Sequence, residues 1–104
     1  MNNIRLLQTP ERLELQISDD SAWGLFDEIA SVLQREFSGS WGEQVDGIDQ
    51  RYWDLKIEKV TLTLHLEHYS GITLFPSSAE LDKVASGILL EKAHRFLTSY
   101  DPAV

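Results

Sequence analysis

Hydrophobic and polar residues alternate from Arg51 to Phe75, and this stretch predicts a three-stranded antiparallel meander. A period of two residues turns one face of each strand toward a core and the other toward solvent. A two-residue hairpin loop at Glu58-Lys59 sets Ile57 opposite Val60 and keeps the apolar positions on one face. The other expected pairs on that face are Leu55 with Leu62 and Trp53 with Leu64.

The second turn of the meander is expected to end on a glycine with positive φ. A three-residue loop, Tyr69-Ser70-Gly71, pairs His68 with Ile72 and Leu66 with Leu74. Such loops commonly place their last residue in the left-handed region, which glycine adopts easily because it has no Cβ. This choice keeps the apolar residues of the third strand on the core face.

Residues 3–7 and 11–17 predict a separate N-terminal hairpin that turns at Gln8-Thr9-Pro10. Proline belongs in the turn because it cannot donate a hydrogen bond to a strand ladder. Apolar residues alternate with polar ones in the second of these strands and define its core face. The expected cross-strand pairs on that face are Leu6 with Leu13 and Ile4 with Leu15.

Two amphipathic segments predict helices. The first follows Ser18-Asp19-Asp20-Ser21, whose side chains are suited to capping, and runs to about Phe37, with Gly39 near its end. The second begins in Pro76–Leu81, where Ser77 and Glu80 have capping-box spacing, and runs to about Leu97 or Tyr100. Its expected apolar face comprises Leu81, Val84, Ala85, Ile88, Leu89, Phe96 and Leu97.

The segment from Trp41 to Gln50 shows no periodicity and predicts an ordered connection that its apolar residues anchor to the protein. Two glycines interrupt it, and three carboxylates make it acidic. Long connections often carry function. The candidate binding residues of this loop are Trp41, Glu43, Asp46 and Asp49.

The predicted order of elements is therefore ββαβββα. It favours an α+β fold, namely a two-layer sandwich with an antiparallel sheet of about five strands and two helices on one face. The length of 104 residues suits one domain spanning residues 1–104. The sequence does not determine the strand order across the two hairpin blocks.

The strand register also predicts which side chains lie on the uncovered face of the sheet. Tyr52 is expected opposite His65, and His65 opposite Phe75, so that a row with two aromatic residues runs between polar rows. Ordinary cross-strand packing on a solvated face is an equally good interpretation. The candidate interaction face comprises Tyr52, Asp54, His65, Glu67 and Phe75.

Composition narrows the classes of function. The chain has 17 acidic and 9 basic residues, a net charge of −8, and no basic cluster of the kind that binds nucleic acid. It contains no cysteine, and neither a signal peptide nor a stretch that could span a membrane is recognisable. We therefore expect a cytoplasmic protein that binds neither nucleic acid nor membrane.

Motifs for catalysis or cofactor binding are not found in the sequence. His65 and Glu67 share a strand face while His68 points the other way, so only two ligands converge where a structural zinc site needs about four. The sequence carries no nucleophile elbow and no phosphate-binding glycine loop. We therefore expect no enzymatic activity, no metal and no cofactor.

The stretch Tyr52-Trp53-Asp54-Leu55, with Leu62–Tyr69 and Gly71-Ile72, resembles a family of single-domain bacterial proteins of about this length with no assigned function. The resemblance covers most of the chain and implies a bacterial α+β domain without inherited catalytic residues. By a looser analogy of fold and charge, small acidic α+β proteins are frequent among immunity-type toxin inhibitors and secretion chaperones.

Three hypotheses about function follow. The first is a protein-binding module that holds a partner, or a second copy of itself, through the open sheet face. The second is a small-ligand-binding or enzymatic domain with its pocket near the Trp41–Gln50 loop. The third is an immunity-type inhibitor or a secretion chaperone. A pocket with converging polar groups and shifted pKa values would favour the second.

Overall fold

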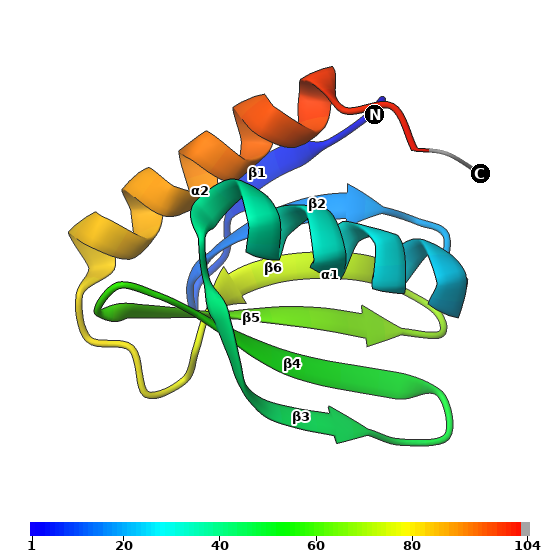
Figure 1. Cartoon of the computed structure of the whole chain (residues 1–104), viewed down its shortest axis with the longest axis horizontal. Helices are drawn as coiled ribbons and strands as arrows, with labels where there is room; N and C mark the ends of the chain where they lie inside the picture. Colours follow the sequence, from blue (N-terminus) through cyan, green and yellow to red (C-terminus); the bar gives the residue numbers. More distant parts are fainter. Residues whose placement is uncertain (103–104) are drawn as a thin grey trace.

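The computed structural model describes residues 1–102, which form a six-stranded antiparallel sheet with both helices on one face (Figure 1). The predicted α+β class is confirmed. The elements in chain order are β1 Arg5–Gln8, β2 Leu13–Ser18, α1 Trp23–Phe37, β3 Ser40–Asp46, β4 Gln50–Ile57, β5 Val60–Glu67, β6 Gly71–Pro76 and α2 Lys83–Ser99.

The strand order is β1-β2-β6-β5-β4-β3, which the sequence had left open. The N-terminal hairpin joins the meander through β2 and β6, and α1 carries the chain from β2 to the far edge of the sheet. The two helices lie side by side over the sheet, and α2 contacts β1, β2, β5 and β6 (Figure 1). The two edge strands of the sheet are therefore β1 and β3.

The prediction of a loop from Trp41 to Gln50 is wrong, because Ser40–Asp46 forms strand β3. This strand pairs with β4 through a register that shifts between Trp41 and Gln44. The irregularity removes the alternation of apolar and polar residues that marks a regular strand, and an edge position leaves most of its side chains exposed. The sheet thus has six strands instead of about five, in the order ββαββββα.

The β4–β5 register is confirmed, including Ile57 opposite Val60 and Tyr52 opposite His65. The β5–β6 register differs from the prediction by two residues, with Leu66 opposite Ile72 and the loop at 68–70. A shift of two residues leaves every side chain on its expected face, so the hydrophobic pattern alone could not distinguish the two registers.

Gly71 has the predicted positive φ, at 83°, although it lies in β6 and not in the loop. A Cβ at this position would lie 2.0 Å from the carbonyl oxygen of Ser18 on β2. Glycine therefore suits this position for two reasons, because it adopts a positive φ easily and because it leaves room for the neighbouring strand.

The N-terminal hairpin shows the same kind of two-residue difference. Leu6 lies opposite Leu15, whereas the sequence predicted Leu13. The turn is longer than expected and comprises residues 9–12. The amide of Thr9 closes it by donating to the carbonyl of Arg12 at 2.8 Å. The side chain of Thr9 also bonds this turn, accepting from the Arg12 amide at 3.1 Å.

The predicted capping of α1 is wrong. The helix begins at Trp23 after Ala22, and no side chain caps its first turn. Asp20 instead accepts a hydrogen bond from the Ala22 amide at 2.9 Å, one residue ahead of the helix. At the other end the left-handed residue is Ser38, with φ of 51°, and not Gly39.

Helix α2 begins at Lys83, later than the predicted Pro76–Leu81 segment, and Asp82 caps it by accepting from the Ala85 amide at 2.9 Å. Glu80 is not a capping-box residue, because its Oε1 accepts from the Thr61 amide at 2.7 Å. The apolar face predicted for this helix is wrong in part, because Leu81, Val84 and Ile88 are exposed. The helix buries Ser86, Leu90, Ala93 and Leu97.

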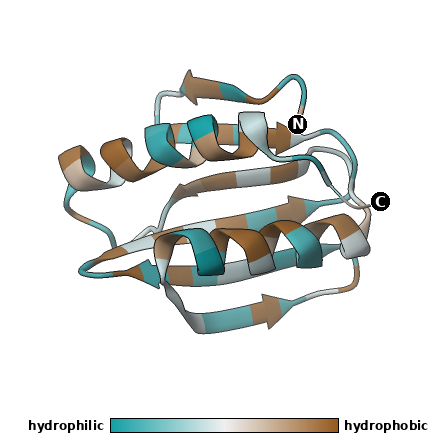
Figure 2. Ribbon diagram, turned by 45° about the horizontal axis from the view of Figure 1, so that its top comes forward, coloured by the Kyte–Doolittle hydropathy of each residue, from teal (hydrophilic) through white to brown (hydrophobic). Residues whose placement is uncertain are grey.

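The core lies between the sheet and the helices. Hydrophobic and hydrophilic segments alternate along the strands in Figure 2, as the period of two requires. Phe26, Ile29 and Leu33 of α1 are fully buried against this face. The fully buried strand residues of the same cluster are Leu15, Ile17, Leu55, Leu62, Leu64, Leu66, Ile72 and Leu74.

Candidate functional site

The uncovered face of the sheet brings three of the predicted side chains into contact. The rings of Tyr52 and His65 are stacked, with centroids 4.2 Å apart and an interplanar angle of 18°. The His65 and Phe75 rings meet edge to face at 5.9 Å. Phe75 lies opposite Thr63 and contacts His65 diagonally, so the row is present although its predicted register is wrong.

A cleft of about 520 Å³ lies over this row. Its floor is buried, since Thr63 is 6% and Phe75 8% exposed, while Tyr52 and Val45 at its side are 41% and 47% exposed. Four of the five predicted face residues line it, together with Glu43 of the segment predicted as a loop. The lining residues are Arg12, Glu43, Val45, Tyr52, Asp54, Thr63, His65, Phe75, Ser77 and Ser78.

Arg12 was not predicted from the sequence, and it covers one end of the cleft floor. Its guanidinium carbon lies 3.7 Å from the centroid of the Phe75 ring. The same group approaches the carboxylate of Glu14 at 3.6 Å. The stacking explains why Phe75 is buried on a face that no helix covers. No local pattern reveals this contact, because it depends on β2 lying beside β6.

His65 is the least satisfied polar residue of the cleft. Its Nε2 atom is buried and has no hydrogen-bond partner among residues 1–102. Burial lowers the pKa of His65 from its ordinary value of 6.5. The charges of Glu67 and Glu14 raise this pKa, and the charge of Arg12 lowers it further. The neutral imidazole is therefore favoured near neutral pH.

Two carboxylates lie at the β3–β4 side of the cleft. Asp54 accepts a hydrogen bond from the hydroxyl of Thr63 at 2.7 Å. In the described part of the chain neither Asp54 nor Glu43 has a basic group within ion-pair distance. Negative charge at this end is consequently not neutralised by the protein itself.

The remaining predicted residues lie elsewhere. Glu67 is at the end of β5, where the Ser70 hydroxyl donates to it at 2.6 Å and lowers its pKa. Trp41 points to the helix-covered face, and its Nε1 donates to Gln34 at 3.1 Å. The Asp49 carbonyl accepts from the amide of His68 at 3.1 Å, which closes the end of the sheet.

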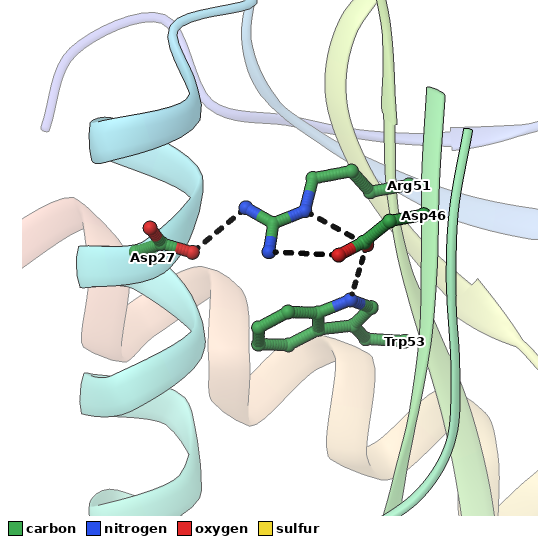
Figure 3. Close-up of polar contacts among 4 residues, drawn as sticks. All are labelled: Asp27, Asp46, Arg51 and Trp53. Carbon is green, nitrogen blue, oxygen red and sulfur yellow. Dashed lines mark hydrogen bonds and ion pairs between the residues drawn. The ribbon is translucent and has the colours of Figure 1, made fainter. Parts of the chain in front are cut away.

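Asp46 belongs to a second polar cluster, on the helix-covered face (Figure 3). Arg51 is only 5% exposed, and its guanidinium bonds Asp27 of α1 at 2.7 Å and Asp46 of β3 at 3.0 Å. Asp46 also accepts from the indole nitrogen of Trp53 at 2.8 Å, and both bonds lower its pKa, the one to Arg51 most. No pattern in the sequence predicted this cluster.

Three aromatic rings enclose the Arg51 guanidinium, whose central carbon lies 4.5 Å from the ring centroids of Trp23 and Phe26 and 4.3 Å from that of Trp53. Bidentate pairing and ring stacking are favoured environments for a buried arginine. This cluster ties α1 to the β3–β4 edge of the sheet. Since its charges are paired internally, it serves the fold.

A second cleft, of about 500 Å³, opens beside the ends of β1 and β2. Two pairs of its polar groups bond each other: Arg5 donates to Gln16 at 2.8 Å, and Ser18 accepts from the Asp20 amide at 3.0 Å. No aromatic residue lines it. It offers an incoming molecule less than the cleft at His65.

Residues 1–102 contain no group of three or more His, Cys, Asp or Glu side chains arranged to hold a metal ion. Within the same residues, neither helix is long and apolar enough to cross a membrane.

The chain belongs to the family described as "Protein of unknown function (DUF3630)", whose model matches residues 1–93. The predicted resemblance to a family without an assigned function is confirmed. No curated protein and no solved structure matches the chain.

Proposed function

We propose that this protein is a binding module and that a partner protein docks on its open sheet face, centred on the cleft at His65. The observation that carries the proposal is an open cleft over the stacked Tyr52–His65 pair, in which the buried Nε2 of His65 has no hydrogen-bond partner within residues 1–102. Buried polar atoms in folded proteins are nearly always bonded, so an unpartnered one marks this face as unusual.

The composition of the face supports a protein as the occupant. Tyr52 and Val45 are exposed, the Phe75 ring forms an apolar floor, and polar side chains surround them. An apolar centre with a polar rim is typical of protein interfaces, and tyrosine is enriched among the residues that dominate binding energy. The cleft is open along the sheet, which suits a segment of a partner chain.

Site-specific photo-crosslinking tests the proposal. A photoreactive phenylalanine analogue is introduced at Tyr52 or, as a matched control, at Glu91, which is exposed on α2. In cells of the source organism, we expect position 52 to give one discrete crosslinked species and position 91 to give none. Mass spectrometry then distinguishes a second copy of this chain from another protein.

A double change, Tyr52→Ala with His65→Ala, complements the crosslinking. It removes the stacked pair from the open face without touching the core, so the variant is expected to fold and to lose the partner. Sedimentation of the purified protein measures self-association in parallel. Equal crosslinking at both positions, or partner capture unaffected by the double change, contradicts docking at this face.

A second candidate function is the binding of a small molecule in the same cleft. Its volume of about 520 Å³ lies within the range of small-ligand sites, and Glu43 and Val45 of the predicted loop line it. A fluorescence melting screen against a metabolite library tests it. A compound that raises the melting temperature of the wild type and not of His65→Ala supports a ligand site.

A further inference from the structure

We infer that the partner segment seated in the cleft presents a cationic side chain, lysine or arginine, to Glu43 and Asp54 beside the Tyr52 ring. The inference rests on the proposed docking at the open face and specifies the chemistry of the occupant. Both carboxylates line the same cleft as Tyr52, and Val45 lies opposite Tyr52 in the β3–β4 register.

The positive and negative side chains of the cleft come from different parts of the sheet. Its one arginine, Arg12, comes from the turn just before β2 and stacks on Phe75 beside Glu14. Glu43 and Asp54 come from β3 and β4, on the other side of β6 and β5 in the sheet order. Lys56 shares the open face and lies two residues from Asp54, yet forms no ion pair in the described chain.

The exposed part of the Tyr52 ring is also suited to a cation. Tyr52 stacks one face of its ring on His65 and remains 41% exposed. A guanidinium or ammonium group that reaches two carboxylates beside an exposed tyrosine ring gains charge-assisted hydrogen bonds and a cation–π contact together. Neutral His65, which burial favours, adds no repulsion to such a group.

The Arg51 cluster provides an internal precedent for this combination. There the protein places its own guanidinium among aromatic rings and pairs it with two carboxylates, Asp27 and Asp46. The cleft offers two carboxylates and an exposed aromatic ring but supplies no cation of its own to them. The net charge of −8 also attracts a basic partner during encounter.

A titration with two matched peptides tests the inference. The probes are the acetylated, amidated tripeptide leucyl-arginyl-leucine and its citrulline counterpart, which keeps the size and shape but replaces the cationic guanidinium with a neutral ureido group. Amide chemical shifts of the ¹⁵N-labelled protein report where each binds. We expect the arginine peptide to shift Tyr52, Asp54 and Thr63, and the citrulline peptide to bind about 10-fold more weakly.

Charge-matched variants separate a specific site from general attraction. Glu43→Gln with Asp54→Asn is expected to weaken the arginine peptide about 10-fold. Glu36→Gln with Glu91→Gln changes the net charge equally at exposed helix positions, and is expected to leave its affinity within about 2-fold. Equal weakening by both pairs overturns the inference, because the attraction is then not local.

The outcomes also distinguish this inference from the proposed function. Equal shifts at the cleft with both peptides overturn the requirement for a cation and leave docking at the open face standing. If neither peptide shifts the cleft residues, the cationic occupant is overturned as well. The docking face itself is tested independently by crosslinking at position 52. Shifts confined to other residues contradict the cationic site.

Discussion

The two faces of the sheet each place a nitrogen-bearing side chain among aromatic rings, with opposite results. On the covered face the Arg51 guanidinium is enclosed by rings and bonded to Asp27 and Asp46. On the open face the His65 ring contacts Tyr52 and Phe75, and its Nε2 has no partner in the described residues.

The difference separates polar groups that stabilise the fold from those available for binding. A buried charge costs several kcal/mol unless it is paired, so the Arg51 cluster stays only because its bonds are made internally. A neutral imidazole with one unmade hydrogen bond costs less than an unpaired charge.

Gly71→Ala should disrupt the framework on which both clusters depend. The new Cβ would lie 2.0 Å from the Ser18 carbonyl oxygen and force β2 away from β6, at a residue with positive φ. We expect a loss of roughly 3 kcal/mol or more in the free energy of unfolding. The matched change Gly24→Ala meets no atom within 4 Å and should stabilise α1 by up to about 1 kcal/mol. Denaturant melts that give both variants the same stability would falsify the prediction.

Arg51→Met should break the covered cluster alone. It keeps an unbranched side chain against Trp53 and removes the guanidinium that joins α1 to β3. We expect a loss of about 2 kcal/mol, below the usual cost of breaking a buried pair, because Asp27 and Asp46 are 59% and 44% exposed and can be rehydrated. Urea unfolding measures it, and a loss no larger than that of His65→Phe would contradict the contrast between the faces.

His65→Phe should leave stability near neutral pH within about 0.5 kcal/mol, because it removes no hydrogen bond. Its effect should appear in acid. The folded pKa lies below 6.5, so as pH falls through 6.5 the unfolded chain takes up a proton that the folded chain resists. Wild-type stability therefore falls from pH 7.5 toward 5.5, and the variant should lack this slope. Parallel slopes in the two proteins would contradict the assignment.

The carboxylates act in a separate pH window. The folded pKa values of Asp46 and Glu67 lie below their ordinary values of 3.8 and 4.5. Their stabilisation is present above those values and is lost as pH falls below them, once the unfolded carboxylates protonate. Melting temperatures of Asp46→Asn and the wild type should accordingly converge as pH falls below 3.8. A constant difference down to strongly acidic pH would contradict this.

Arg12→Met should have the smallest effect. It replaces a half-exposed cation over the Phe75 ring with an apolar chain that still covers the ring. We expect a loss of about 0.5 kcal/mol or less, consistent with a cation–π contact at an exposed site. Arg12→Ala, which uncovers Phe75, should cost more than Arg12→Met in the same melts. The reverse order would indicate that charge, and not coverage of the ring, is what matters.

Much of the candidate site was predictable because it depends on side-chain direction. Alternation placed Tyr52, Asp54, His65 and Phe75 on the open face, and an error of two residues in the β5–β6 register did not move them from it. Strand β3 escaped prediction for the opposite reason. Its irregular pairing near Trp41 and its exposed edge position remove the period on which prediction relies.

The alternation of residues was enough to predict the fold class, the β4–β5 register and the face on which each meander residue lies, because these follow from a period of two residues and a short turn. Tertiary packing alone sets the strand order, the place of Arg12 over Phe75 and the enclosure of Arg51 by Trp23, Phe26 and Trp53. These contacts join residues from different elements. Their geometry is set by packing of the whole sheet and its helices, which no local pattern encodes.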